Sequence, residues 1–250
     1  MSGPSNQLAR IRVVDLETTG FDATDSIVEI GAVDLIGSDI VLVGAQLFRP
    51  PVPIPPQASA VHHITDEHVG TCPSVDEHLP RFLDHERSAG VQAFCAHNWK
   101  FEKQWLGELL GDRPAICTYK ASLRAWPDAP SHTNQALRYR LKPHGLDGQI
   151  ANVAHRALPD AYVTAVILRE LLKKATVTQL IAWTEEPALL RRVSFGKHRG
   201  ALWQDVPADY LRWIIEKSDQ NEDVKFTAKF YLRKLHNTEQ VHRHSSALPV

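Results

Sequence analysis

Cysteine is scarce in this chain of 250 residues, where it occurs only as Cys72, Cys95 and Cys117. The odd number and the lack of any Cys-x-x-Cys pair argue against a disulfide framework and against a zinc-finger type of metal site. Cys95 and Cys117 lie within apolar runs. We therefore expect them to be small buried side chains of a protein from a reducing compartment.

Long apolar runs are also missing. No window approaches the ~18 apolar residues that are needed to cross a membrane. The N-terminal segment MSGPSNQLAR contains no apolar stretch of the kind that a signal peptide has. We therefore expect a cytoplasmic protein that has no membrane partner.

Neither sign of charge predominates, because 28 Lys and Arg residues stand against 29 Asp and Glu residues, a net charge of −1. This balance excludes a protein that holds nucleic acid by overall positive charge alone, although it leaves room for a local basic patch or a bound metal. The apolar fraction of 43% and the scattered 16 Pro and 13 Gly residues are typical of a globular protein. The length allows one large domain, or a main domain with a small partner.

The first part of the chain predicts a mixed β-sheet. Apolar alternation indicates strands over residues 9–16, 26–36 and 39–48, separated by turn signals. Residues 49–57 hold five prolines, which argue against a helix or a central strand, so we expect an extended surface loop. Helices and strands then alternate, with helices over 74–88, 98–110, 122–126, 134–141 and 159–174 and strands over 91–96 and 115–119. This pattern predicts an α/β domain over residues 8–175, in which helices cover a mixed sheet.

A smaller α+β module is expected over residues 176–236, followed by a disordered tail over 237–250. The periodicity indicates helices and one short strand, with helices over 177–190, 207–218 and 222–235, a strand over 192–195 and a basic turn over 196–200. Trp203 and Trp213 are expected in the core of this module, with a base-stacking platform as the alternative. Residues 1–175 carry 17 basic and 20 acidic side chains, net −3, whereas residues 176–250 carry 11 and 9, net +2.

The sharpest signal is the segment Asp15-Leu16-Glu17-Thr18-Thr19-Gly20 at the end of the first expected strand. Side chains alternate along a strand, so Asp15 and Glu17 point to the same face. Two carboxylates this close repel each other unless a cation lies between them, and oxygen ligands favour Mg²⁺ or Mn²⁺ over zinc. The alternative is a strand that ends in a solvated acidic turn, with Gly20 at positive φ.

This segment resembles the first motif of the DEDDh 3′–5′ exonucleases, the superfamily that includes polymerase proofreading subunits. The family's other motifs recur in order: His97-Asn98-Trp99-Lys100-Phe101-Glu102 resembles its His-Asn-x-x-Phe-Asp pattern, and His155 precedes Asp160 by five residues ahead of an apolar helix. Ala60-Val61-His62-His63-Ile64-Thr65 resembles its Ile-His-x-Ile-Thr segment. Taken singly, these acids are ordinary helix carboxylates and His155 is an ordinary loop histidine, but their common order favours a site.

The resemblance implies a ribonuclease H-like fold and a site for two divalent ions, Mg²⁺ or Mn²⁺, with Asp15, Glu17, Glu102 and Asp160 as ligands. His155 would be the catalytic general base, and the product would be a nucleoside 5′-monophosphate. Glu102 departs from the family, which has Asp there, and its extra methylene moves the carboxylate by about 1.5 Å. We hypothesise that Glu102 contacts the second metal, directly or through water. The alternative is a weakened or Mn²⁺-preferring site.

The same resemblance assigns residues to the substrate. Backbone groups around Thr18 and Thr19 would meet the terminal 3′ hydroxyl, and His62 and Asn98 would face the nucleotide. Phe21, just past the turn, is a candidate wedge against a terminal base, with plain packing as the alternative. These assignments come from the family motifs and not from the residues alone.

The C-terminal residues resemble a small module that occurs in one subgroup of this family. The matching segments are Ser194-Phe195-Gly196-Lys197-His198-Arg199-Gly200 and Asp209-Tyr210-Leu211-Arg212-Trp213. With them the resemblance spans roughly residues 10–235 and implies a DNA substrate. Lys197 and Arg199 form a basic loop that would contact phosphates without reading sequence, and the alternative is a solvated hairpin tip.

We therefore expect a metal-dependent 3′–5′ exodeoxyribonuclease that acts on single-stranded DNA and on 3′ ends of duplex DNA, as in DNA repair. An exoribonuclease on the same fold is one alternative, because nothing in the sequence reads a 2′ hydroxyl. A nucleic-acid-binding module with a weakened active site, suggested by Glu102, is the other. The oligomeric state stays open, with a homodimer among the alternatives.

Overall fold

The computed structural model of the chain describes residues 10–83 and 90–245, which fall into two units. The first unit comprises residues 1–125 and 129–184, and the second comprises residues 126–128 and 185–250. The division follows Thr184 and so lies later than the expected boundary near residue 175. Helix α9 (Val177–Glu185) is tied to the first unit, because the Thr184 hydroxyl accepts a hydrogen bond of 2.8 Å from the N–H of Cys117.

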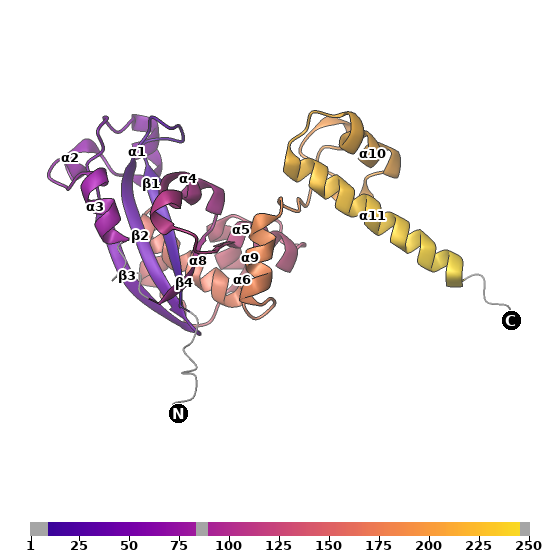
Figure 1. The fold of residues 1–250 in the computed structure, drawn as a ribbon, viewed down its shortest axis with the longest axis horizontal. Helices are drawn as coiled ribbons and strands as arrows, with labels where there is room; N and C mark the ends of the chain where they lie inside the picture. The colour runs from indigo at the N-terminus through magenta and orange to yellow at the C-terminus, as the bar shows by residue number, and fades with distance from the viewer. Residues whose placement is uncertain (1–9, 84–89, 246–250) are drawn as a thin grey trace, which may run out of the picture. The chain divides into compact units, whose positions relative to one another are not determined.

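A five-stranded mixed sheet forms the centre of the first unit, in the order β3-β2-β1-β4-β5. Strands β1 to β4 are labelled in Figure 1. Its strands are β1 (Arg10–Thr18), β2 (Ile27–Ile36), β3 (Asp39–Leu47), β4 (Val91–Ala96) and β5 (Ala115–Cys117). Strand β2 is antiparallel to its neighbours β1 and β3, whereas β1, β4 and β5 run parallel. The expected mixed sheet is therefore confirmed, and β1 lies in its middle.

Helices cover both faces of this sheet. They are α1 (Pro56–His62), α2 (Asp66–Val69), α3 (Val75–Phe82), α4 (Trp99–Leu110), α5 (Thr118–Ala125), α6 (Asn134–Leu141), α7 (Gly148–Ala151) and α8 (Ala157–Leu171), with α9 after them. On one face, Val14 and Leu16 of β1 belong to an apolar core with Leu106 of α4. On the other face, α8 packs along β1 and β2. Asp15 and Glu17 alternate with the apolar pair of β1 and therefore point to the α8 face.

Several expected helix boundaries in this unit are wrong, among them the end of α9, which lies at Glu185 and not at residue 190. Helix α1 begins at Pro56, inside the segment that the sequence predicts to be a loop, because proline fits the first turn of a helix, where its missing N–H leaves no hydrogen bond unmade. Helix α5 begins at Thr118, directly after β5, and not at residue 122. Helix α3 ends at Phe82, and the part of its expected length over 84–88 lies outside the described residues.

The second unit is a small helical module. It contains two 3₁₀ turns, η1 (Gly196–His198) and η2 (Trp203–Asp205), and two helices, α10 (Ala208–Lys217) and α11 (Glu222–Ser245). The expected strand over 192–195 is reduced to an isolated bridge between Arg192 and Leu202. Helix α11 continues to Ser245, whereas the sequence predicts a disordered tail from residue 237, and residues 246–250 lie outside the described part.

The two tryptophans of the module differ in burial. Trp203 is fully buried and packs in the core with Leu211 and Ile214, as expected. Trp213 is 45% exposed, so the expectation of a core position is wrong for this residue. Leu211 and Ile214 take the core-facing side of α10, which leaves Trp213 on the solvent side.

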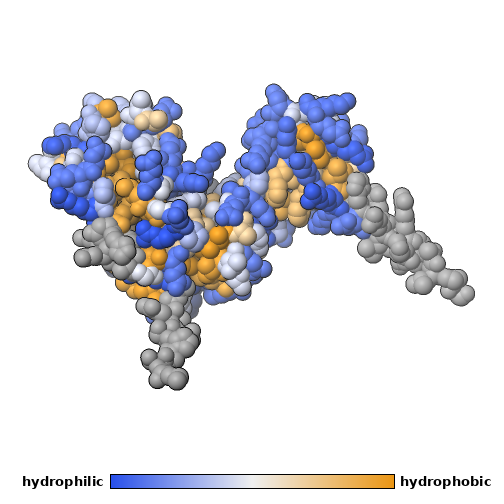
Figure 2. Space-filling view, in the orientation of Figure 1, coloured by the Kyte–Doolittle hydropathy of each residue, from blue (hydrophilic) through white to orange (hydrophobic). Residues whose placement is uncertain are grey.

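Hydrophilic residues cover most of the visible surface of each unit, with smaller apolar patches between them (Figure 2). Cys95 and Cys117 are buried free thiols, as expected. Within the described ranges, no helix combines the length and the apolar character that a membrane span requires.

Candidate active site

The approach of α8 to the sheet depends on a glycine opposite Asp15. In the antiparallel register, Asp15 of β1 pairs with Gly31 of β2. A Cβ at Gly31 would lie 2.2 Å from the backbone nitrogen of Leu158, so only glycine allows the first turn of α8 to come this close. Asp160 lies in that turn. The glycine therefore lets α8 bring a third carboxylate to the end of β1.

Three carboxylates meet at this point. Asp15, Glu17 and Asp160 each offer one oxygen, and these oxygens lie within 4.8 Å of one another. All three residues are partly exposed, so a ligand can reach them from solvent. An oxygen donor set with this separation suits a hard divalent cation such as Mg²⁺ or Mn²⁺. The structure thus brings together three of the four expected metal ligands.

Electrostatic repulsion within the cluster favours a bound cation. Burial raises the pKa of Asp15 well above its usual range, and the charges of Glu102 and then Glu17 raise it further. Burial, followed by the charges of Asp160 and Glu29, raises the pKa of Glu17 to about 8. Glu17 therefore holds a proton near neutral pH unless a cation neutralises the cluster.

The fourth expected ligand, Glu102, is an electrostatic neighbour of Asp15, but it does not belong to the group whose oxygens lie within 4.8 Å of one another. It lies in the first turn of α4 and is only 3% exposed. Burial raises the pKa of Glu102 to about 8, and its Oε2 atom is buried without a hydrogen-bond partner. Such an oxygen is costly, and a cation or a water of its shell would satisfy it. The chemistry of Glu102 therefore fits a metal ligand.

Asp160 is held in place by two hydrogen bonds. Its Oδ2 accepts one of 2.7 Å from the backbone N–H of His155, and its Oδ1 accepts one of 3.1 Å from Nε2 of Gln135. Burial raises the pKa of Asp160, and these two hydrogen bonds oppose the rise. Asn134 also donates to the backbone oxygen of Asp160, at 3.2 Å. Sequence reasoning missed Gln135 and Asn134, because the pattern of their helix gives no sign of this role.

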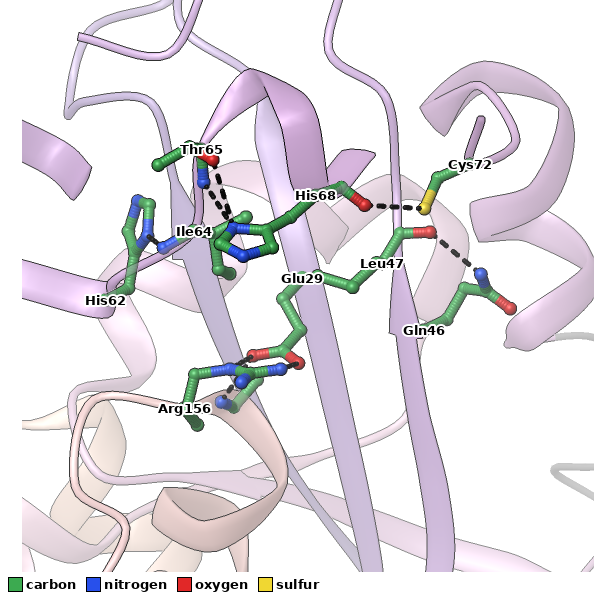
Figure 3. Close-up of polar contacts among 10 residues, drawn as sticks. Glu29, Gln46, Leu47, His62, Ile64, Thr65, His68, Cys72 and Arg156 are labelled. Carbon is green, nitrogen blue, oxygen red and sulfur yellow. Dashed lines mark hydrogen bonds and ion pairs between the residues drawn. The ribbon is translucent and has the colours of Figure 1, made fainter. Parts of the chain in front are cut away.

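The loop that carries His155 is anchored to β2. His155 is exposed and has a left-handed backbone, with φ of 61°. The guanidinium of Arg156 donates to both oxygens of Glu29, at 2.5 and 2.9 Å (Figure 3). The N–H of Ala157 donates to the same carboxylate at 3.0 Å. Glu29 is 2% exposed and lies directly opposite Glu17 in the register. Sequence reasoning missed Glu29, whose only signal is a carboxylate inside an apolar strand.

His62, the last residue of α1, is buried, and a hydrogen bond selects one tautomer of its ring. Its Nδ1 accepts a hydrogen bond of 3.0 Å from the N–H of Ile64, so the proton of the neutral ring lies on Nε2 (Figure 3). The Nε2 atom is buried. Burial lowers the pKa of His62, and the backbone of Thr18 and the charge of Glu29 oppose this fall. The ring therefore offers one N–H donor near the end of β1.

The turn after β1 is held by its own hydrogen bonds. The Thr18 hydroxyl donates to the carbonyl of Gly20 at 2.6 Å, and the Thr19 hydroxyl donates to Asp25 at 2.9 Å. The N–H of Thr19 donates to the carbonyl of Ser26 at 2.9 Å. These bonds fix the shape of the turn, and they engage both hydroxyls and the N–H of Thr19.

The remaining expected substrate residues are exposed. Phe21 is 80% exposed, and its ring meets Phe101 of α4 edge-on, with centroids 5.9 Å apart. Asn98 is the N-cap residue of α4, and its side chain makes no capping hydrogen bond. Lys197 and Arg199 are exposed residues of the second unit.

Comparisons with known proteins agree with this arrangement. A family model for exonucleases, RNase_T, matches residues 13–168. Exodeoxyribonuclease 10 of Escherichia coli (strain K12) is 34% identical over 228 residues, which cover 89% of this chain and 98% of that protein. A solved structure of exonuclease X in complex with 5′ overhanging duplex DNA is 33% identical, with a TM-score of 0.56, and covers 70% of this chain and 99% of its own. The nuclease domain of 3′hExo, a DEDDh family member bound to rAMP, shares the fold at 15% identity, with a TM-score of 0.53 and coverage of 68% and 94%. This chain therefore belongs to the RNase T family of exonucleases, in its DEDDh 3′–5′ branch of phosphodiester hydrolases.

Proposed function

We propose that this chain is a metal-dependent exodeoxyribonuclease, which removes nucleotides from DNA 3′ ends and releases nucleoside 5′-monophosphates. The observation that carries the proposal is the cluster of Asp15, Glu17 and Asp160, whose oxygens lie within 4.8 Å of one another. A DNA substrate is supported by Exodeoxyribonuclease 10, because its similarity covers 89% of this chain and so extends into the second unit. The duplex in the exonuclease X complex supports action on duplex 3′ ends as well as on single strands.

The metal ligands in this proposal are the four acids of the site, and they would hold two divalent ions. Their fit rests on atoms of this chain, namely three oxygens at short separation and the buried Oε2 of Glu102, which has no partner. When bound, Mg²⁺ or Mn²⁺ would neutralise the carboxylates and polarise the phosphodiester.

The proton transfer would fall to His155. A neutral imidazole accepts a proton near neutral pH, so His155 would take one from the attacking water. The water oxygen would bond to phosphorus as the bond from phosphorus to the 3′ oxygen breaks, and that oxygen would take a proton from solvent and become the new 3′ hydroxyl. Asp160 would help to position the residue that carries this base, because its Oδ2 accepts the 2.7 Å hydrogen bond from the backbone N–H of His155.

The terminal nucleotide would be received by groups beside the carboxylates. The exposed Phe21 ring would pack against the terminal base, and His62 would face the nucleotide. Backbone atoms around Thr18 and Thr19 would meet the 3′ hydroxyl, and Asn98 would contact the same nucleotide. Lys197 and Arg199 would contact phosphates elsewhere on the strand.

The test is an end-labelled cleavage assay. DNA and RNA oligonucleotides with a 5′ label are incubated with the full chain in Mg²⁺, in Mn²⁺ or in a chelator. Asp15→Asn serves as the inactive variant, and Asp39→Asn, which changes an exposed acid of the same unit, serves as its matched control. We expect a metal-dependent ladder on DNA that shortens from the 3′ end, unchanged in Asp39→Asn and absent in Asp15→Asn.

Other results of this assay would replace the proposal. A ladder confined to RNA would make the chain an exoribonuclease, and binding without cleavage would make it a nucleic-acid-binding module with an inactive site. Because trimming of 3′ ends is a step of DNA repair, we propose repair as the process that the DNA activity serves.

A further inference from the structure

An aromatic stack lies in the second unit, apart from the residues of the carboxylate site. Tyr210 and Trp213, about one turn apart on α10, are stacked with ring centroids 5.3 Å apart and an interplanar angle of 20°. The His198 ring meets Tyr210 edge-on at 4.6 Å, and Nζ of Lys197 lies 5.0 Å from the centre of the Tyr210 ring. The η1 loop and α10 thus combine a cation with two stacked aromatic rings.

The close contact between the η1 loop and Tyr210 depends on Gly196. The φ of Gly196, 59°, lies in the left-handed region, and a Cβ there would be only 2.5 Å from the Tyr210 hydroxyl oxygen. Tyr210 also packs against the apolar core of the module. The ring that supports Trp213 is therefore held before any ligand arrives, which lowers the entropy lost on binding.

The exposure and the charges of this surface indicate what it binds. Trp213 leaves 45% of its surface accessible, and exposed aromatic residues of this size are typical of binding surfaces. Asp209 and Glu216 flank Trp213 at helical spacing, so α10 itself has no excess of positive charge. Stacking on the indole must then supply most of the binding energy, and the exposed Lys197 and Arg199 of the loop supply the attraction to phosphate.

We propose that the surface formed by Lys197, Arg199, Tyr210 and Trp213 binds single-stranded nucleic acid, with an unpaired base stacked on the Trp213 indole and the basic loop at its phosphates. A single strand is favoured because a paired base has no free face to stack on a side chain. The inference rests on the proposed function in taking nucleic acid as the polymer. Because the module is covalently joined to the catalytic unit, a strand that is bound to the module has a high effective concentration for the active site.

The first test separates base stacking from charge. The full chain, kept in a chelator to prevent cleavage, is titrated against a labelled oligothymidylate and against an abasic deoxyribose-phosphate strand of the same length, with fluorescence anisotropy as readout. Trp213→Ala should weaken binding of the oligothymidylate about fivefold or more and leave the abasic strand unaffected. Trp213→Phe should keep most of the affinity, since it keeps an aromatic face.

The matched control is Phe230→Ala, which removes another exposed aromatic ring from the same module, 39% exposed on α11. Phe230→Ala should bind both strands with the same affinity as the parent protein. Melting curves of all variants show that the module stays folded. The proposal is wrong if Trp213→Ala binds oligothymidylate like the parent, or if it loses the abasic strand to the same extent.

The second test concerns the basic loop. The double variant Lys197→Ala, Arg199→Ala should weaken both strands and reduce the slope of log affinity against log salt by about 1.4, at about 0.7 for each lost phosphate contact. The control variant Lys225→Ala, Lys229→Ala removes two charges from α11 and should change the slope less. Equal slopes in the two double variants would assign the effect to general charge and overturn the role of the loop.

Cleavage of a dinucleotide in Mg²⁺ distinguishes this inference from the proposed function. If the parent cleaves it and Trp213→Ala cleaves it equally well but binds long strands weakly, both proposals stand. If the parent cleaves no nucleic acid yet binds strands through Trp213, the proposed function fails and the binding surface remains. If cleavage is normal and Trp213→Ala binds long strands as tightly as the parent, only the proposal of the binding surface is wrong.

Discussion

Glu29 of β2 holds Arg156, in the loop before α8, through hydrogen bonds of 2.5 and 2.9 Å. The same carboxylate is 2% exposed and accepts a third hydrogen bond, of 3.0 Å, from the N–H of Ala157. A buried carboxylate with three such partners is rigid, so the residues around Arg156 share its position. His155 and Asp160 are thus fixed relative to the strand next to β1, which carries the other two carboxylates of the cluster.

Replacement of Glu29 by Gln is expected to lower kcat by about 10- to 100-fold with little change in KM, because a displacement of about 1 Å in a base or a metal ligand reduces a rate this much. Glu29→Asp should lose less, since it keeps a negative charge for Arg156. Steady-state kinetics on an end-labelled oligonucleotide measure both effects.

The control for this prediction is Asp34→Asn. Asp34 is another buried carboxylate of β2, and it pairs with the fully buried Arg12 at 2.8 Å. Both substitutions remove the charge of a buried carboxylate that pairs with an arginine and should lower Tm, but only Glu29→Gln should lower the kcat of the protein that stays folded. Equal losses of kcat in the two variants, or none in Glu29→Gln, would contradict a positioning role for Glu29.

The stability of the metal-free protein should fall as the pH rises. Glu17 has a usual pKa of 4.5, which applies to the unfolded chain, whereas its pKa in the folded protein is about 8. The folded state therefore holds this proton more tightly, and the resulting stability is complete below about pH 4.5 and is lost as the pH rises through about 8. The raised pKa of Asp15 acts in the same direction. Thermal melts in a chelator across this window measure the fall in Tm, and Glu17→Gln should flatten it.

Divalent ions should reverse this fall, because they take the place of the protons between the carboxylates. The increase in Tm on addition of Mn²⁺ is expected to be larger at about pH 8 than at about pH 6, and metal binding near pH 7 should release protons. Calorimetry in two buffers with different ionisation enthalpies counts these protons. Metal binding that is equally tight at both pH values, without proton release, would show that the carboxylates are not protonated in the metal-free site.

Glu102→Ala is expected to reduce the initial rate by about 100-fold in both Mg²⁺ and Mn²⁺, because it removes a buried carboxylate oxygen that has no protein partner. Glu102→Asp should keep a larger part of the rate, since an aspartate retains the charge. Glu108→Ala changes an exposed acid of the same helix and should have no effect. An unchanged rate in Glu102→Ala would remove Glu102 from the site.

The shared face of Asp15 and Glu17 could be predicted from strand alternation, and the proximity of Asp160 is implied by the resemblance of its motif to that of the DEDDh family. The contribution of Glu29 could not be predicted, since it depends on the register that sets Glu29 opposite Glu17 and on the position of the loop before α8. Gln135 is hidden for the same reason: its contact with Asp160 joins two helices that are separate in the sequence. Local patterns predict elements, whereas these contacts depend on packing.

In the second unit, the sequence likewise did not predict which tryptophan is buried. Both tryptophans lie in apolar surroundings in the sequence, and an apolar pattern favours the core for each. Only the rotation of α10 separates them, because Leu211 and Ile214 occupy its inner side and Trp213 remains 45% exposed. A helix of ten residues with several apolar positions allows more than one inner face, and the choice is made by the residues that pack against it.

Gly31→Ala tests whether the site depends on the close approach of α8 to β2. The new Cβ would lie 2.2 Å from the backbone nitrogen of Leu158, so the first turn of α8 must move, and Asp160 with it. We expect a loss of about 1–3 kcal/mol in the free energy of unfolding and a weaker affinity for Mn²⁺, measured by denaturant titration and by calorimetry.

Gly107→Ala is the matched control, because its Cβ would meet only the Lys103 side chain, at 3.6 Å, inside helix α4. It should gain about 0.5–1 kcal/mol from helix propensity and leave metal affinity unchanged. Unchanged Mn²⁺ affinity in Gly31→Ala would mean that Asp160 reaches the cluster without this contact.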